Sequence, residues 1–157
     1  MRLEDIEIGK IADIGSHLFS AEEIVRFARA FDPQPFHLDD RAAAATHFGA
    51  LCASGWHTCA VWMRLTVDYS RTYGTLAGIS PGMKAIRWLR PVHAGDTIRY
   101  FNEVRAKRRL RSRPGWGIID TLARAENQHG ETVLEMEGSV LVPAPSTGDG
   151  KDNGTER

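Results

Sequence analysis

The pattern of apolar and polar residues first predicts a helix after Ser20. Glu22 and Glu23 follow this serine, and a hydroxyl can cap free N–H groups while acids suit the positive end of the helix dipole. Four apolar residues then recur at helical spacing, namely Ile24, Phe27, Ala28 and Phe31. The helix is expected to end at Asp32, because Pro33 disfavours the helical conformation in the residue before it.

The same kind of pattern predicts two more helices. Asp39 is placed to cap a short helix that runs through Ala42 to Ala45. The strongest helical segment opens at Ser54 and runs toward Tyr73. It is apolar over much of its circumference, so we expect it to be buried in a sheet or an interface rather than to lie on the surface.

From residue 83 onward the pattern changes to a period of two, which predicts strands. The predicted strands cover residues 83–90, 97–104, 117–125 and 132–142. The sequence Asn-Gln-His-Gly at residues 127–130 indicates a hairpin between the last two. Because helices come first and consecutive strands follow, the order predicts an α+β fold with an antiparallel sheet.

Length and composition describe one globular domain. The chain has 157 residues, of which 42% are hydrophobic and 25% charged, and neither the disordered nor the fibrous class fits this composition. We expect a single domain over residues 1–142. Residues 143–157 lack an apolar anchor and are rich in Gly, Pro and small polar residues, so they are predicted to form a disordered tail.

The net charge and the lengths of the apolar stretches indicate which partners and which cellular location to expect. Twenty Lys and Arg residues balance twenty Asp and Glu residues, so no net field steers the protein to nucleic acid, and self-association is unopposed. Charged or His residues interrupt the apolar stretches before the roughly 18 residues of a membrane span, and the N-terminus has no signal-peptide core. We therefore expect a cytoplasmic protein without membrane contact. Cys52 and Cys59 accompany no CxxC motif or Cys/His grouping, so neither a disulfide nor a metal site is expected.

Residues 31–39, FDPQPFHLD, place an acid and an imidazole five positions apart across two prolines. We expect Pro33 and Pro35 to exclude a helix there and to stiffen the loop. A stiff loop can hold the Asp32 carboxylate and the His37 imidazole around one water molecule, as general acid–base chemistry on a neutral substrate requires. In the alternative interpretation, Asp32 only ends the helix and His37 bonds the backbone of an ordinary loop.

The residues that open the long helix are a second candidate site. A helix N-terminus offers unpaired N–H donors and a partial positive charge, and Gly55 lets a substrate approach the backbone closely. These features suit a thioester carbonyl, because fixed donors stabilise the enolate that forms when a nucleophile adds to the β-carbon of an enoyl thioester. The alternative is a plain Ser54 N-cap, with Gly55 chosen for tight packing.

Three motifs together resemble one known family. FDPQPFHLD, then ASGWH, then PVHAGDTI leading into a strand are similar to the MaoC-like dehydratases, which include the (R)-specific enoyl-CoA hydratases. The resemblance spans roughly residues 19–142 and implies a hot dog fold, in which a curled antiparallel sheet wraps one long central helix and two such units pair side by side. It also implies that Asp32 and His37 bind and activate water, and that the Gly55 amide binds the thioester carbonyl.

Two positions depart from the family pattern. The family loop commonly reads Asp-x-Asn-Pro-x-His, whereas this chain has Gln34 at the Asn position. Many hydratases have His before the glycine, where this chain has Ser54. We assign Gln34 and Ser54 supporting roles.

The resemblance implies a hydro-lyase of fatty acid metabolism. Such an enzyme adds water reversibly to a trans-2-enoyl thioester, most simply of coenzyme A, and gives a 3-hydroxyacyl-CoA. Coenzyme A would enter only as part of the substrate, with no separate cofactor, and the active unit would be a homodimer or a higher oligomer built from dimers. Two alternatives stay open: a thioesterase on the same fold, and a non-catalytic acyl-thioester-binding module.

A basic run within residues 105–113 contains four further candidates, Arg105, Lys107, Arg108 and Arg109. These side chains are candidates to hold the phosphates of coenzyme A, since Arg pairs well with phosphate oxygens. A solvated strand end or loop is the alternative. Aromatic residues are not interleaved through the run, which argues against nucleic acid as its partner.

Overall fold

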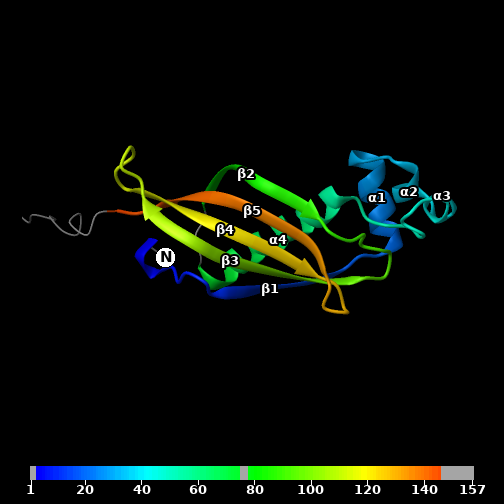
Figure 1. Ribbon diagram of the computed structural model, residues 1–157, viewed down its shortest axis with the longest axis horizontal. Helices are drawn as coiled ribbons and strands as arrows, with labels where there is room; N and C mark the ends of the chain where they lie inside the picture. The colour runs from blue at the N-terminus through cyan, green and yellow to red at the C-terminus, as the bar shows by residue number, and fades with distance from the viewer. Residues whose placement is uncertain (1–2, 75–77, 146–157) are drawn as a thin grey trace, which may run out of the picture.

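The computed structural model describes residues 3–74 and 78–145 of the chain. In chain order its elements are the 3-10 helix η1 (Leu3–Asp5), β1 (Ile11–Leu18), α1 (Ala21–Phe31), α2 (Pro35–Leu38), α3 (Asp40–Ala44), α4 (Gly55–Tyr73), β2 (Ile79–Trp88), β3 (Thr97–Arg109), β4 (Trp116–Glu126) and β5 (Thr132–Pro143). Figure 1 shows α1, α2 and α3 grouped at one end of the molecule, beyond the end of the sheet.

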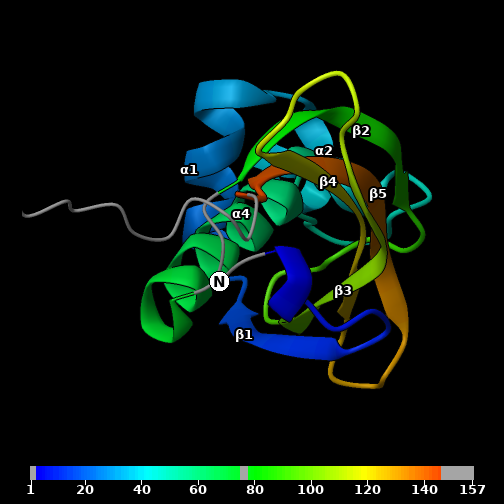
Figure 2. The same cartoon turned by 90° about the vertical axis from the view of Figure 1, so that its left-hand side faces the viewer.

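The strands form one five-stranded sheet in the order β1-β3-β4-β5-β2, and every neighbouring pair is antiparallel. The sheet curls around α4, as the end view in Figure 2 shows. This arrangement confirms the predicted α+β hot dog fold. No helix in the described parts of the chain is long and apolar enough to cross a bilayer.

The predicted helix boundaries of α1 and α4 are confirmed, because both depend on local capping. The Ser20 side chain accepts a hydrogen bond from the Glu23 N–H, and α1 ends at Phe31, just before Asp32. The Ser54 side chain caps α4 in the same way. At the other end of α4, Gly74 adopts a left-handed conformation with φ 60°, which ends the helix without a Cβ penalty.

The prediction that the two prolines exclude a helix is wrong. Pro35–Leu38 form the short helix α2, with Pro35 in its first turn. Proline is tolerated there because its missing N–H has no partner in the first turn of a helix anyway. The loop after Asp32 is therefore followed by a single helical turn, which carries His37.

The strand β1 was absent from the sequence prediction. It lies at the edge of the sheet, and Ile11 and Leu18 at its two ends are exposed while Ile14 is buried. An irregularity in the pairing between Asp13 and Gly15 breaks its alternation. An edge strand with a bulge lacks the regular period of two that identifies a strand in a sequence.

The folded part of the chain extends past residue 142, the predicted domain end. β5 includes Pro143, and Ala144 is fully buried, with its N–H bonded to the Gly115 carbonyl at 2.8 Å. Backbone pairing also lengthens β3 to Arg109, five residues beyond its predicted end. The rest of the predicted tail, residues 146–157, lies outside the described residues.

The main core lies between α4 and the sheet. Its buried members are Ile14, Phe19, Ile24, Leu51, Ala53, Val92, Ile98, Tyr100, Ala123, Ala125, Val133, Leu134 and Met136. A second cluster covers the other end of the sheet, with Leu3, Ile6, Ile119, Val142 and Ala144. α4 packs one face on the main core through residues such as Trp62 and Leu65, while Met63 and Val67 on its other face are exposed.

Phe19→Ala is predicted to lower the free energy of unfolding by about 3–5 kcal/mol, because the phenyl ring is fully buried and its loss leaves a cavity. Phe31→Ala is the matched control, since 74% of that residue is exposed, and it should change stability by less than about 0.5 kcal/mol. Urea denaturation measures both. Equal losses would contradict the assignment of Phe19 to the core.

Candidate active site

A short backbone pairing holds the segment before α4 against the connection between β2 and β3. Cys52 and His93 form an isolated antiparallel bridge, and the Ala53 N–H donates to the Val92 carbonyl at 2.8 Å. The motif PVHAGDTI therefore has a structural role, because its first residues hold the segment that leads into α4. Asp32, His37 and Gly55 come together at this end of the molecule.

Asp32 is held by two side chains that donate to its carboxylate. The Gln34 Nε2 donates to Oδ1 at 2.8 Å, and the Ser54 Oγ donates to Oδ2 at 2.7 Å. Burial acts to raise the pKa of Asp32, but these hydrogen bonds and the nearby His37 outweigh it and leave the pKa below its ordinary value. The carboxylate is therefore ionised and fixed in direction at neutral pH. Gln34 and Ser54 both contact it directly, and their supporting roles in the reaction stay predictions.

His37 is buried, and its ring orientation is set by the backbone. Its Nδ1 lies 2.7 Å from the Cys52 carbonyl oxygen, which can only accept, so Nδ1 carries the proton and donates it. In the neutral ring Nε2 is then a bare acceptor, and it lies 3.5 Å from Asp32 Oδ2. That distance is long for a direct hydrogen bond. One water molecule bound by both groups can donate a hydrogen to each, which leaves its oxygen free to attack.

The N-terminus of α4 leaves one N–H donor free. The Trp56 N–H donates to the Ser54 Oγ at 3.2 Å, and the His57 N–H donates to the Ser54 carbonyl at 2.9 Å. Among the described residues, nothing accepts from the Gly55 N–H. A Cβ at Gly55 would overlap the indole of Trp88. Tight packing against Trp88 therefore requires glycine at this position, which was the structural interpretation of the sequence. The residue also presents a free N–H donor, which was the functional interpretation.

A carboxylate shared by two histidines lies beside the same end of α4. Glu23 Oε1 lies 2.6 Å from His17 Nε2 and 3.3 Å from His57 Nε2, so it joins β1, α1 and α4. The buried His57 ring stacks on Phe27, with 4.5 Å between ring centroids. Burial lowers the pKa of His57, although the Glu23 carboxylate acts in the opposite direction. Nothing in the sequence places these residues together, because they belong to three separate elements.

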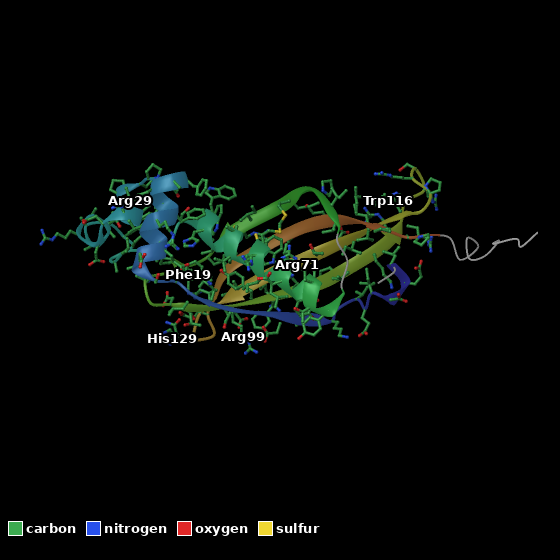
Figure 3. All side chains as sticks on the ribbon, turned by 180° about the vertical axis from the view of Figure 1, so that it is seen from behind. Phe19, Arg29, Arg71, Arg99, Trp116 and His129 are labelled. Atoms are coloured by element: carbon green, nitrogen blue, oxygen red, sulfur yellow. The ribbon has the colours of Figure 1, made fainter. Side chains whose placement is uncertain are left out.

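The four basic candidates for phosphate contact lie at the other end of β3. At the usual rise per residue, this strand extends about 40 Å from Thr97, near α1, to Arg109. Figure 3 shows Phe19 and Trp116, which mark these two ends, well apart. Each side chain has a partner in the chain: Glu103 for Arg105, the Ile6 carbonyl for Lys107, Asp120 for Arg108 and Glu4 for Arg109. The structure does not bring them to Asp32 and His37, and the phosphate role stays a prediction.

Neither cysteine has the setting of a nucleophile. Both thiols are free. Burial raises the pKa of Cys52 to about 11, and it also raises the pKa of Cys59. Both sulfurs are therefore protonated at neutral pH, whereas a nucleophilic cysteine must be a thiolate. Within residues 3–74 and 78–145, no group of three His, Cys, Asp or Glu side chains is arranged to hold a metal ion.

Known proteins are similar to this chain over most of its length. The family model described as MaoC like domain matches residues 10–123. The crystal structure of a MaoC-like dehydratase from Rhodospirillum rubrum has a TM-score of 0.84 and 38% identity, and the match covers 92% of this chain and 97% of that one. The uncharacterized protein YdeM of Bacillus subtilis is 32% identical over 142 residues, 90% of this chain and 99% of that protein. The 3-hydroxyacyl-thioester dehydratase Z of Mycobacterium tuberculosis is 30% identical over 120 residues, 76% of this chain and 72% of that protein.

Ser54→Ala is predicted to raise the pKa of Asp32, because the carboxylate loses the hydroxyl that donates to Oδ2. The substitution also removes the cap of α4, which lowers the free energy of unfolding by about 1 kcal/mol. Ser20→Ala removes the cap of α1 without a direct contact to Asp32 and is the matched control. NMR titration of the Asp32 carboxyl carbon measures the pKa, and equal values in the two variants would exclude this role for Ser54.

Proposed function

Because the chain belongs to the MaoC-like dehydratase family, we propose that it adds water reversibly to a trans-2-enoyl-CoA thioester to give a 3-hydroxyacyl-CoA. The observation that carries the proposal is the pair of acceptors, Asp32 Oδ2 and His37 Nε2, held 3.5 Å apart beside the free N–H of Gly55. The relative named 3-hydroxyacyl-thioester dehydratase Z supports the same class of substrate. A hydro-lyase needs these three groups and no redox step.

In the proposed reaction, Asp32 and His37 hold one water molecule against the β-carbon of the substrate. Asp32 takes a proton as the water oxygen forms its bond to that carbon, and the electrons of the double bond move to the thioester carbonyl oxygen. The Gly55 N–H donates to this oxygen and stabilises the enolate. The proton that Asp32 takes passes to His37 Nε2, 3.5 Å away, and His37 delivers it to the α-carbon. One hydrogen of water stays on the new hydroxyl, the other ends on the α-carbon, and both side chains return to their starting states. Because both acceptors are already oriented, little reorganisation precedes attack.

A thioesterase is the second candidate, because the same water could attack the thioester carbonyl. The position of the free Gly55 donor does not separate the two reactions, since it stabilises negative charge on that oxygen in both. A non-catalytic acyl-thioester-binding module is the third. The fixed, ionised Asp32 beside the oriented His37 favours a catalyst, because a pure binder gains nothing from a water held between two acceptors.

The proposed active unit is a homodimer. β2 pairs only with β5 among the described strands, so its other edge is open. The exposed apolar side chains next to this edge are Trp56, Met63 and Val67 on α4 and Met83 and Trp88 on β2. Trp56 and Trp88 touch edge to face with ring centroids 5.2 Å apart, and Trp88 packs on Gly55, so this apolar face borders the site. A second copy related by a two-fold axis would cover the same face on both chains.

Asp32→Asn and His37→Gln are each predicted to lower the hydration rate by at least about 100-fold, because each removes one acceptor for the attacking water. Asp68→Asn is the control, since that carboxylate is exposed on α4 and, within the part of the chain that the structure describes, accepts only from Arg64. The assay follows enoyl ultraviolet absorbance and free thiol together over short, branched and aromatic enoyl-CoA substrates, and circular dichroism checks the fold.

The two signals separate the candidates. Loss of absorbance without thiol release supports the hydratase, and thiol release with the double bond intact supports the thioesterase. Ligand binding without either signal supports the binding module. Undiminished hydration in a folded Asp32→Asn or His37→Gln variant would exclude the assigned roles.

The double substitution Met63→Glu with Val67→Glu is predicted to convert the dimer to a monomer, because it places two charges in the proposed apolar interface. Ile8→Glu is the matched control, since Ile8 is an exposed apolar residue that belongs to neither α4 nor β2. Sedimentation velocity measures the mass in solution. A wild-type monomer, or a dimer that survives the double substitution, would contradict the proposed interface.

A further inference from the structure

One buried polar atom near the N-terminus of α4 has no hydrogen-bond partner. Among the buried side-chain nitrogen and oxygen atoms of residues 3–74 and 78–145, only His57 Nδ1 is unbonded. Leaving a buried acceptor unbonded destabilises the folded state, because the atom has lost its hydrogen bond to water. Native proteins keep such atoms where a ligand, a catalytic partner or a bound water completes them.

The surroundings of His57 fix the orientation of its ring. Its Nε2 lies 3.3 Å from Glu23 Oε1, and this carboxylate also accepts from His17 at 2.6 Å. Phe27 stacks on the ring with an interplanar angle of 5°, and Phe19 contacts it edge to face with 5.0 Å between centroids. A ring flip would move Nε2 away from the carboxylate, so Nδ1 remains the nitrogen that needs a partner.

The chemistry of Nδ1 limits what can bind there. Nε2 carries the proton that points at the Glu23 carboxylate, and burial lowers the pKa of His57, so the ring is neutral at physiological pH. Nδ1 is then an acceptor with no hydrogen of its own. A hydroxyl or N–H group can satisfy it. A carbonyl or ether oxygen and a hydrocarbon cannot.

His57 belongs to the same helical turn as the proposed thioester site. Its N–H donates to the Ser54 carbonyl at 2.9 Å, and the Ser54 hydroxyl donates to Asp32. Gly55, with its free N–H, is two residues away on the same helix, where one full turn rises only about 5.4 Å. On the other side, Phe27 contacts Phe31, which directly precedes Asp32. The rise along α4 from Gly55 to His57 is about 3 Å, which is shorter than an acyl chain of a few carbons.

We propose that His57 Nδ1 accepts a hydrogen bond from a hydroxyl group on the acyl chain of the substrate, so that the site prefers hydroxylated 2-enoyl thioesters to those with a plain hydrocarbon chain. This specificity rests on the proposed hydration at Asp32 and His37, but it concerns an atom that takes no part in that reaction. A single buried water is the competing partner for Nδ1.

The first test compares matched substrates with the wild-type protein. The probes are trans-2-hexenoyl-CoA, its 5-hydroxy and 6-hydroxy derivatives, and the 5-oxo derivative, which has nearly the same shape but no donor. We expect kcat/KM to be about tenfold or more higher for one hydroxylated probe than for hexenoyl-CoA, as one hydrogen bond to an otherwise unbonded acceptor provides. The 5-oxo probe should show no gain. Equal kcat/KM values for all four probes would overturn the proposal.

The second test replaces the acceptor. His57→Phe keeps an aromatic ring against Phe27 but has no nitrogen. The ratio of kcat/KM for the hydroxylated probe to kcat/KM for hexenoyl-CoA should therefore fall to about 1. His129→Leu removes an exposed histidine in the β4–β5 turn and should keep the preference. An unchanged preference in a folded His57→Phe protein would mean that Nδ1 holds water only. If that variant does not fold, the wild-type comparison decides alone.

A binding measurement separates this proposal from the proposed function. Calorimetry with the Asp32→Asn protein gives Kd for the same four CoA thioesters without turnover. A tighter Kd for a hydroxylated probe, together with no hydration of any substrate by the wild-type protein, would retain the binding site and exclude the hydratase. Hydration with neither a Kd nor a kcat/KM preference would retain the hydratase and exclude the His57 site.

Discussion

The hydroxyl of Ser54 is the contact on which the rest of the site depends. The same oxygen accepts the Trp56 N–H at the start of α4 and donates to Asp32 Oδ2 just after the end of α1. One atom therefore begins the central helix and directs the carboxylate. Because α4 is packed inside the curled sheet, the carboxylate and the Gly55 N–H are held on rigid elements rather than on a free loop. Groups that are fixed before the substrate arrives need little rearrangement during the reaction.

The second half of the site is oriented by backbone. The Cys52 carbonyl accepts from His37 Nδ1, and the pairing of Cys52 with His93 holds that carbonyl in place. The motif around His93 thus acts on His37 from a distance, through a carbonyl that fixes which nitrogen of His37 carries the proton. The two donors on Asp32 keep its pKa low despite burial. Asp32 Oδ2 and His37 Nε2 therefore lie 3.5 Å apart with both side chains held in direction.

The parts of this structure that were predictable from sequence have local causes. The start of α4 at Ser54 follows from a capping side chain and the β4–β5 hairpin from its turn residues. The spacing of Asp32 and His37 left an ordinary loop open as an alternative, and the resemblance to a known family was needed to pair them. The sequence does not predict β1, because an edge strand with a bulge has no regular alternation. It does not predict α2 either, because proline usually ends a helix, although it is tolerated in the first turn. The contacts from Ser54 to Asp32 and from Glu23 to His57 join separate elements. No pattern within one segment contains that information.

The measurement that most directly tests the central claim is the position of oxygen-18 after a single incubation of an enoyl-CoA in labelled water. If Asp32 and His37 direct water to the β-carbon, mass spectrometry will find one heavy oxygen at C3 of an intact hydroxyacyl-CoA, and the free acid will be absent. Label found in a released carboxylate would show that water attacks the thioester carbonyl, and no incorporation across the substrate panel would show that the site does not activate water. Either result would contradict the account.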